Sequence, residues 1–268
     1  MVVTFLSDFG LRDEYVGTCH GVIKRIAPAA EIIDITHGIG AHRVLHGALV
    51  LANTLPYMPV GVHLAVVDPG VGTERRALAL RSGDGRLFVG PDNGLLFLAA
   101  ERLGGVESAH ELQNPRYALD WISPTFHGRD LFAPASAHLC AGVALEELGP
   151  RIDPGTLVRL APPEPELGRG QIRATVLDVD RFGNIQLNLD REQVLAAGFA
   201  PGAELELEHL GERYYAAAAR TFADARPGDL ILYEDSYRFF AVAISEGKAA
   251  DLLAVAPGHE LSIRLRVA

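Results

Sequence analysis

Residues 2–10, VVTFLSDFG, form an apolar run that breaks at a polar turn containing glycine. Such a run is typical of a buried strand that ends in a loop. Apolar residues then recur at helical spacing from Val16 to Ile26, and Pro28 ends the pattern. A second apolar run at 31–35 predicts the next strand. This strand–helix–strand order is the unit from which parallel α/β sheets are built.

The same alternation continues to about residue 102. Helices are predicted over 42–55 and 94–102, and strands are predicted over 63–67, 77–80 and 87–89. The first half of the chain therefore predicts an α/β domain with a largely parallel sheet. Ligands of such sheets bind beyond the carboxyl ends of the strands, so polar residues at those ends become candidates for a site.

The pattern changes after about residue 155. Residues 161–167, which include APPEP, cannot continue a helix or a central strand and are interpreted as a linker. Short strand-like runs follow, separated by turns rich in glycine and proline, at 171–177, 185–189, 204–208, 213–217, 230–232, 239–244 and 261–267. This spacing predicts an all-β small barrel or sandwich. We therefore expect an α/β N-terminal domain over 1–160 and a barrel-like C-terminal domain over 168–268.

The composition is that of an ordinary globular protein. Of the 268 residues, 49% are hydrophobic and 22% are charged, and the formal net charge is -10. Adjacent Lys/Arg residues occur only as two isolated pairs, so no basic patch is predicted and a nucleic-acid partner is not expected. No apolar stretch approaches the roughly 20 residues that span a bilayer. Because the N-terminus also lacks a charged leader, a cytoplasmic protein with no membrane partner is expected.

Carboxylates follow two of the predicted strands. Asp8 follows the first, where it could cap the next helix or accept two hydrogen bonds from a diol such as a ribose. Asp68 follows the third, at the start of DPGVGTERR. The tight loop after it could bring Arg75 alongside, as an exposed ion pair or as part of a site.

Two further polar segments occupy loop positions. His127, in PTFHGRD, precedes an apolar helical run that begins near Asp130; it could be structural, or it could orient or deprotonate a water. Asn184, in DRFGN, lies in a sequence typical of a hairpin turn, although its amide could pair with an adenine edge. The common phosphate-loop, dinucleotide, zinc-protease and serine-hydrolase motifs are absent from the sequence.

Six segments in this order resemble the S-adenosyl-L-methionine hydroxide adenosyltransferase family, whose relatives include fluorinase and the S-adenosylmethionine-dependent chlorinase. The segments are SDFG (7–10), DPGVG (68–72), GPDNGLL (90–96), FHGRD (126–130), FGN (182–184) and TFADA (221–225). The resemblance implies an α/β domain, a small β-barrel and a homotrimer whose active sites lie at subunit interfaces. It implies S-adenosyl-L-methionine as the substrate, with no cofactor and no metal.

The resemblance assigns the reacting groups to the N-terminal domain. Asp8 is expected to hold the ribose hydroxyls, and three residues are expected to hold the attacking water: Asp68, Arg75 and His127. The halogenating relatives carry a tyrosine where Asp68 stands and a serine where Gly128 stands. Because a carboxylate beside the reacting carbon repels a halide, water is the predicted nucleophile. The predicted reaction is hydrolysis to adenosine and L-methionine by attack on the ribose 5′ carbon.

The resemblance assigns the rest of the substrate to the C-terminal domain. Asp180 is expected to meet the methionine ammonium, Asn184 the adenine edge, and Phe222 the adenine face. Ser236 lies where the family contacts the methionine carboxylate. There this chain departs from the halogenases, because Tyr237 follows that serine where they carry an arginine.

Two other functions are compatible with the same residues. A metal-assisted phosphoesterase would use as ligands of a hard cation Asp8, Asp13, Asp68, His127 and Asp130. A non-catalytic sensor would bind adenosine or S-adenosylmethionine through Asp8, Asn184 and Phe222 without turnover.

Overall fold

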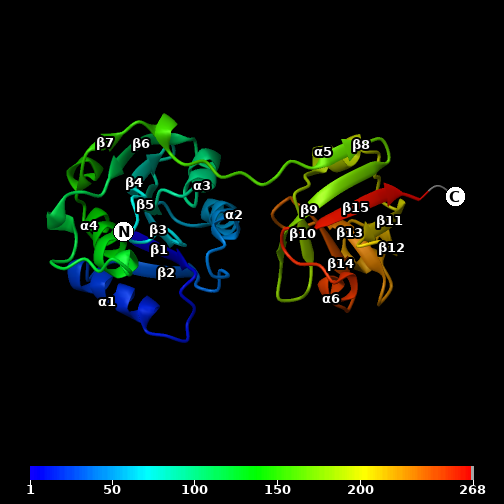
Figure 1. The fold of residues 1–268 in the computed structure, drawn as a ribbon, viewed down its shortest axis with the longest axis horizontal. Helices are drawn as coiled ribbons and strands as arrows, with labels where there is room; N and C mark the ends of the chain where they lie inside the picture. The colour runs from blue at the N-terminus through cyan, green and yellow to red at the C-terminus, as the bar shows by residue number, and fades with distance from the viewer. Residues whose placement is uncertain (267–268) are drawn as a thin grey trace. The chain divides into compact units, whose positions relative to one another are not determined.

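The computed structural model describes residues 1–266. The chain divides into two compact units, Met1–Ala161 and Pro162–Ala268, each with its own buried core (Figure 1). The last residue of the predicted strand 261–267, Val267, lies outside the described residues.

The first unit is built on a seven-stranded sheet of order β2-β1-β3-β5-β4-β6-β7. Its strands are β1 (Val2–Ser7), β2 (Glu31–Thr36), β3 (Val62–Val66), β4 (Ala77–Ser82), β5 (Leu87–Pro91), β6 (Val106–Glu111) and β7 (Arg151–Ile152). The β1–β2, β1–β3 and β3–β5 pairs are parallel, whereas β4 and β7 run against their neighbours. Five of these seven strands therefore point the same way, and the predicted α/β class with a largely parallel sheet is confirmed.

Helices cover both faces of this sheet (Figure 1). The α-helices are α1 (Tyr15–Ile26), α2 (Val44–Thr54), α3 (Phe97–Arg102) and α4 (Ala133–Cys140). On β1, Phe5 packs into the core beneath α1 and α4, and Leu6 packs into the core beneath α2 and α3. Because both faces of the sheet are buried, the sequences of its central strands are continuous apolar runs. The shorter helical turns are η1 (Leu55–Tyr57), η2 (Pro115–Tyr117), η3 (Gly128–Phe132), η4 (Leu145–Leu148), η5 (Pro154–Thr156) and, in the second unit, η6 (Phe222–Asp224).

The second unit is a closed barrel. Its strands are β8 (Glu166–Gly168), β9 (Gln171–Val179), β10 (Ile185–Leu187), β11 (Glu204–His209), β12 (Glu212–Ala218), β13 (Leu230–Glu234), β14 (Phe240–Ile244) and β15 (Glu260–Leu265). Seven of them form a ring that the β9–β10 pairing closes, so the predicted barrel is confirmed. β8 pairs with β9 outside this ring and takes up the end of the segment predicted as a linker. Two short helices, α5 (Arg191–Ala196) and α6 (Ala249–Leu253), complete the unit.

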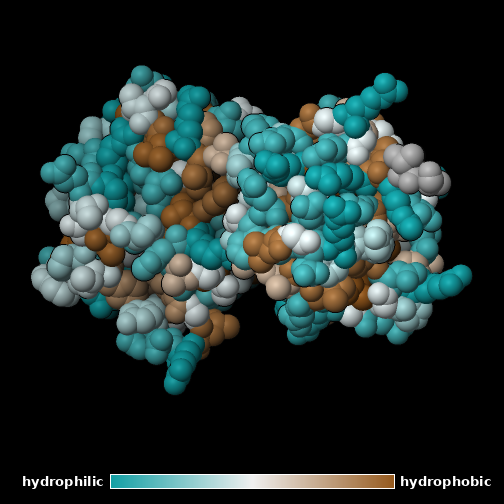
Figure 2. Space-filling model, turned by 45° about the vertical axis from the view of Figure 1, so that its right-hand side comes forward, coloured by the Kyte–Doolittle hydropathy of each residue, from teal (hydrophilic) through white to brown (hydrophobic). Residues whose placement is uncertain are grey.

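The surface of both units is mainly hydrophilic in the view of Figure 2, with smaller apolar patches between the polar side chains. Among the described residues, no helix has the length and apolar character needed to cross a membrane. Cys19 and Cys140 are free thiols, and burial raises the pKa of Cys19 to about 12.

The core of the first unit contains a titratable group that makes stability depend on pH. His63 on β3 is fully buried, with Nδ1 2.8 Å from the Thr4 hydroxyl. Burial, with a smaller effect from the positive charge of Arg86, lowers the pKa of His63 to about 3. An unfolded chain takes up this proton near pH ~6.5, whereas the folded chain does not. The free energy of unfolding should therefore fall as pH decreases below about 6.5, by up to ~1.4 kcal/mol per pH unit from this group.

Urea unfolding of the wild type and of His63→Gln, at about pH 7, 6 and 5, measures this contribution. The variant should lose less stability on acidification than the wild type, whatever its stability at neutral pH. Equal slopes for the two proteins would show that His63 takes up a proton in the folded state.

Candidate active site

The loops after β1 and β3 open onto a cavity of about 120 Å³ at one edge of the sheet. Because β1 and β3 are parallel neighbours, with Ser7 opposite Val66, their carboxyl ends lie side by side. A third segment, just before η3 and α4, completes the wall. The cavity is lined by Asp8, Phe9, His42, Val66, Asp68, Val71, Thr125, Phe126, His127 and Gly128.

Asp68 and Arg75 form a buried two-pronged ion pair beside this cavity. Arg75 Nε lies 2.9 and 3.0 Å from the two carboxylate oxygens of Asp68, and Nη2 lies 2.5 Å from Oδ2. Only 6% of the Asp68 side chain and 10% of the Arg75 side chain are exposed. The pair is therefore held in one geometry, unlike an exposed ion pair, which contributes little and moves freely.

His127 joins this pair through the same guanidinium. Its Nδ1 lies 2.8 Å from Arg75 Nη2. A guanidinium can only donate, so Nδ1 accepts and a neutral imidazole carries its proton on Nε2. Burial, followed by the positive charge of Arg75, lowers the pKa of His127, and Asp68 offsets part of this effect. His127 is therefore neutral at physiological pH. Its Nδ1 accepts a hydrogen bond from Arg75 and so helps to hold the guanidinium in place.

A glycine brings these three side chains together. Gly72 has φ of 77°, and a Cβ at this position would lie 2.4 Å from the carbonyl oxygen of Pro124. Only glycine lets the loop after β3 approach the segment that carries His127 so closely. The contact between Arg75 and His127, 52 residues apart, depends on this approach.

Asp8 directly follows β1 and is half-buried. Its Oδ2 accepts a 3.0 Å hydrogen bond from the backbone N–H of His42. His42 holds a left-handed φ of 64°, which also delays the start of α2 to Val44, two residues after the predicted start. Asp8 does not cap α1, because that helix begins at Tyr15, so the capping interpretation is wrong. Its carboxylate instead lines the cavity, where it can accept hydrogen bonds from hydroxyl groups.

Phe9 and Phe126 form an aromatic wall of the cavity, and Tyr15 packs against both rings. Phe9, Tyr15 and Phe126 pack edge to face or tilted, with ring centroids 5.1 to 6.1 Å apart. Gly128 lies against this wall, and a Cβ there would come within 2.8 Å of the Phe9 ring. Sequence reasoning missed the contribution of Phe9 and Phe126, although both lie inside the polar motifs that it singled out.

In the second unit, Asp180 and Asn184 organise the turn between β9 and β10. Asp180 Oδ1 accepts hydrogen bonds from the backbone N–H groups of Phe182 and Asn184, at 2.8 and 2.9 Å. Asp180 Oδ2 accepts the side-chain amide of Asn184 at 2.8 Å. The hairpin interpretation is thus correct for the backbone, and the carboxylate fixes the orientation of the Asn184 amide.

The other two residues predicted in this unit lie on neighbouring turns. Phe222, on η6, is 45% exposed, and its ring centroid is 4.8 Å from that of Tyr233. Burial, with the negative charges of Asp235 and Asp180, raises the pKa of Tyr233 to about 12. Ser236 is exposed on the turn from β13 to β14. Tyr233 therefore contacts the Phe222 ring and also lies close enough to Asp235 and Asp180 to feel their negative charges.

Asp8, Asp68 and His127 line one cavity, but the five ligands required by a metal-assisted phosphoesterase do not come together at ligand distance. Asp130 is bound instead by Arg129 and by the backbone N–H of Ser123, and Arg75 takes both oxygens of Asp68. Over residues 1–266, the one group of three potential metal ligands lies elsewhere in the first unit and contains none of the five. The phosphoesterase interpretation is therefore wrong on geometric grounds.

Comparison with known proteins places the chain in a family. The SAM hydroxide adenosyltransferase N-terminal domain matches residues 3–149, and the C-terminal domain of the same family matches residues 174–262. The chain belongs to this family, in which SAM denotes S-adenosyl-L-methionine, and the resemblance inferred from the six segments is confirmed.

Its relatives include hydrolases and halogenases. The (R)-S-adenosyl-L-methionine hydrolases of Salinispora arenicola and Thermus thermophilus are 50% and 41% identical, over 97% and 96% of both chains. The fluorinase of an Actinoplanes species is 30% identical over 90% of both chains. A solved structure of an uncharacterized conserved protein from Thermotoga maritima is 36% identical, with a TM-score of 0.90 over 98% of this chain and 99% of that one.

Proposed function

We propose that this chain hydrolyses S-adenosyl-L-methionine to adenosine and L-methionine, by attack of water on the ribose 5′ carbon. The observation that carries the proposal is the buried Asp68–Arg75–His127 cluster, which shares a cavity with the carboxylate of Asp8. The hydrolases named above, at 41–50% identity, support the same reaction.

The cavity favours water over a halide as the nucleophile. Asp68 carries a negative charge. A halide ion at contact distance from it would be repelled strongly in a partly dry site. A water molecule can instead donate a hydrogen bond to that carboxylate. Val71 adds an apolar side chain to the wall, and the Phe9 ring leaves no space for a side chain at Gly128. Hydroxyl donors that would solvate a halide at these two positions are therefore lacking.

The bond changes need little help from an acid. The water oxygen forms the bond to the 5′ carbon while the carbon–sulfur bond breaks, and its electron pair stays on sulfur, which leaves as a neutral thioether. One water proton must be lost, and the Asp68 carboxylate is the acceptor that we propose for it. Arg75 holds that carboxylate in place, and in this proposal the proton passes to it as the oxygen attacks. General-base assistance of this kind contributes about 10²–10⁴-fold, and the fixed position of the water supplies the rest.

The remaining predicted residues bind the substrate in this proposal. A volume near 120 Å³ matches about four water molecules, so it suits the sugar edge and the nucleophile and cannot enclose the whole substrate. Asp8 would hold the ribose hydroxyls. In the barrel unit, Asp180 would meet the methionine ammonium, Asn184 the adenine edge and Phe222 its face, with Ser236 near the methionine carboxylate. We propose a homotrimer in which one subunit supplies the cavity and a neighbour supplies the barrel residues.

Isotope labelling tests the reaction directly. Purified chain incubated with S-adenosyl-L-methionine in ¹⁸O-enriched water should release adenosine and methionine in equal amounts, with one heavy oxygen in each adenosine. Chromatography with mass detection measures both products. Tight binding without adenosine release would favour the sensor instead. Unlabelled adenosine, or labelled methionine, would contradict attack of water on the 5′ carbon.

A further inference from the structure

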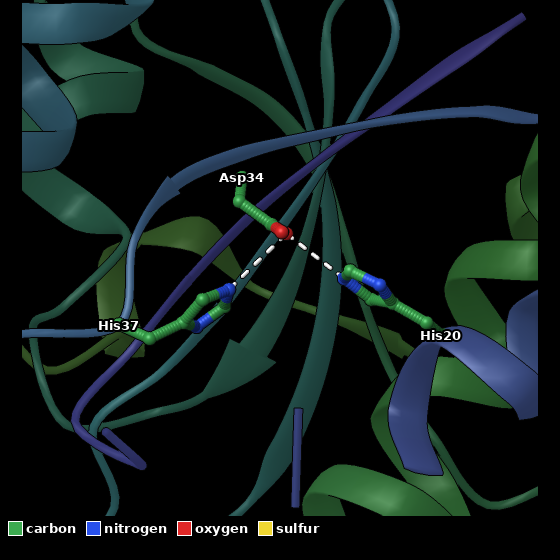
Figure 3. A group of neighbouring side chains, drawn as sticks. All are labelled: His20, Asp34 and His37. Carbon is green, nitrogen blue, oxygen red and sulfur yellow. Dashed lines mark hydrogen bonds and ion pairs between the residues drawn. The ribbon is translucent and has the colours of Figure 1, made fainter. Parts of the chain in front are cut away.

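A second cluster of polar side chains lies outside the lining of the cavity, between α1 and the edge strand β2. It consists of His20 on α1, Asp34 on β2 and His37 just after β2 (Figure 3). Both imidazoles point toward the same carboxylate oxygen. His20 Nε2 lies 2.9 Å from Asp34 Oδ1, and His37 Nε2 lies 3.1 Å from it.

These distances suit three ligands of one small cation. With zinc–ligand bonds of about 2.0–2.1 Å, the ligand atoms of a tetrahedral site are ~3.3 Å apart. The three ligand atoms here all lie within 4.8 Å of one another, and the two histidine–carboxylate pairs, at 2.9 and 3.1 Å, are a few tenths of an ångström shorter than the tetrahedral spacing. Side-chain rotations that bring all three pairs to that spacing would form such a site. Two imidazoles and one carboxylate are a donor set that zinc and its first-row neighbours accept, whereas magnesium and calcium prefer oxygen alone.

His37 provides an independent reason to expect a ligand. Only 2% of its side chain is exposed, and Nε2 makes no aligned hydrogen bond, although it approaches Asp34 Oδ1 to 3.1 Å. A buried polar nitrogen without an aligned partner costs stability, which a bond to a cation would restore. The other ring nitrogen, Nδ1, lies 2.7 Å from the Ser7 hydroxyl, an outer partner of the kind that orients metal-bound histidines.

The local backbone explains how the three side chains meet. The register of β1 with β2 shifts between Phe5 and Leu6, whose partners are Asp34 and Thr36, so Ile35 is an extra residue. Ile35 packs on the α2 face of the sheet, whereas Asp34 and His37 meet His20 from the α1 face. A bulge of this kind re-aims the side chains that follow it and lets residues three apart share a face.

We propose that His20 Nε2, Asp34 Oδ1 and His37 Nε2 bind one first-row divalent cation, with zinc as the preferred ion. The exposed fractions of the His20 and Asp34 side chains, 30% and 38%, leave an approach for the ion and for a water as fourth ligand. The ring of Phe5, with centroids 6.0 Å from His20 and 4.6 Å from His37, forms the apolar side of the site.

Such an ion would hold the loop that carries Asp8. The Ser7 hydroxyl that contacts His37 Nδ1 also accepts the N–H of Phe9 at 3.3 Å, and the N–H of Gly10 donates to the carbonyl oxygen of His37 at 2.8 Å. A cation on Nε2 leaves the proton on Nδ1, which then donates to Ser7. The ion would therefore join α1, β2 and the 7–10 loop, and its role is structural rather than chemical.

Metal titration of a chain without a polyhistidine tag tests this site. Zinc, and cobalt(II) as a coloured probe, should bind at one ion per chain, and the cobalt complex should show the strong visible absorption of a tetrahedral site. His20→Gln and Asp34→Asn should each raise the dissociation constant by about 100-fold, since even outer partners are worth 10–100-fold. His138→Gln, which removes a partly exposed histidine from α4 in the same unit, should bind as the wild type does.

Thermal unfolding gives a second measurement. Zinc should raise the unfolding midpoint of the wild type and of His138→Gln, and it should not raise that of His20→Gln. Circular dichroism establishes that each variant is folded. Failure of the wild type to bind zinc or cobalt at micromolar concentrations would overturn the site. So would a His20→Gln variant that binds zinc as tightly as the wild type, or a His138→Gln variant that loses as much zinc affinity as His20→Gln is expected to lose. None of these measurements depends on hydrolysis of S-adenosyl-L-methionine.

Discussion

Arg75→Ala should lower kcat for hydrolysis of S-adenosyl-L-methionine by about 10³-fold and leave KM within a few fold of the wild type. A loss of this size is expected when one fixed polar group acts mainly in the transition state. The guanidinium donates to both oxygens of Asp68 and, through Nη2, to His127 Nδ1. Without it, the buried carboxylate has no cation, and the proposed water site loses its geometry. Steady-state release of adenosine measures the change.

The matched control is the next residue. Arg76 carries the same charge, but it pairs with Asp92 and Thr156 and does not line the cavity. Arg76→Ala should keep kcat close to that of the wild type. A similar loss in both variants would indicate damage to the loop rather than to the water site.

A titration supplies a readout that a purely structural role would not produce. Arg75 is one of the causes that lower the pKa of His127, second to burial. In Arg75→Ala that pKa should rise toward its ordinary value, which proton NMR of the imidazole measures. In Arg75→Lys the charge remains, but an ammonium cannot match the planar two-pronged contact, so kcat should stay low while the pKa of His127 stays depressed. An Arg75→Ala enzyme with unchanged kcat would show that the cluster does not hold the nucleophile.

The central strands and their helices could be predicted because the sheet is buried on both faces. Residues such as Phe5 and Leu6 face opposite cores, which produces unbroken apolar runs with polar breaks at their ends. β6 was not predicted, because its sequence VESAHE contains the polar residues Glu107 and His110 and has no run of large apolar residues. α5 was not predicted, although Asp190 and Gln193 form a capping box at its start.

The site was only partly predictable for a related reason. Strand ends are visible in the sequence, so Asp8 and Asp68 could be placed at one edge of the sheet. The contact of Arg75 with His127 depends on the close approach of Gly72 to the Pro124 carbonyl oxygen. No local sequence pattern predicts this approach. The His20, Asp34 and His37 cluster has no motif spacing at all, because a single extra residue in β2 brings it together.

Asp8→Ala should impair both binding and turnover, because a contact to the ribose acts in the ground state and also orients the 5′ carbon. Two hydrogen bonds to a charged carboxylate are worth about 3 kcal/mol together, so we expect a rise of about 100-fold in the dissociation constant. A fall in kcat should accompany it. Asp13→Ala is the control, since Asp13 is an exposed aspartate of the same loop that does not line the cavity. Calorimetry and adenosine release measure the two effects.

The sharper form of this test compares two substrates. The wild type should bind S-adenosyl-L-methionine much more tightly than an analogue that lacks the 2′-hydroxyl, because the analogue leaves Asp8 with one partner fewer. Asp8→Ala should bind the two almost equally. Asp8→Asn keeps an oxygen that can accept the His42 N–H, so the loop stays in place and only the charge is lost. If Asp8→Ala still bound S-adenosyl-L-methionine much more tightly than the analogue, another group would hold the sugar. The proposed orientation of the 5′ carbon toward Asp68 would then be wrong.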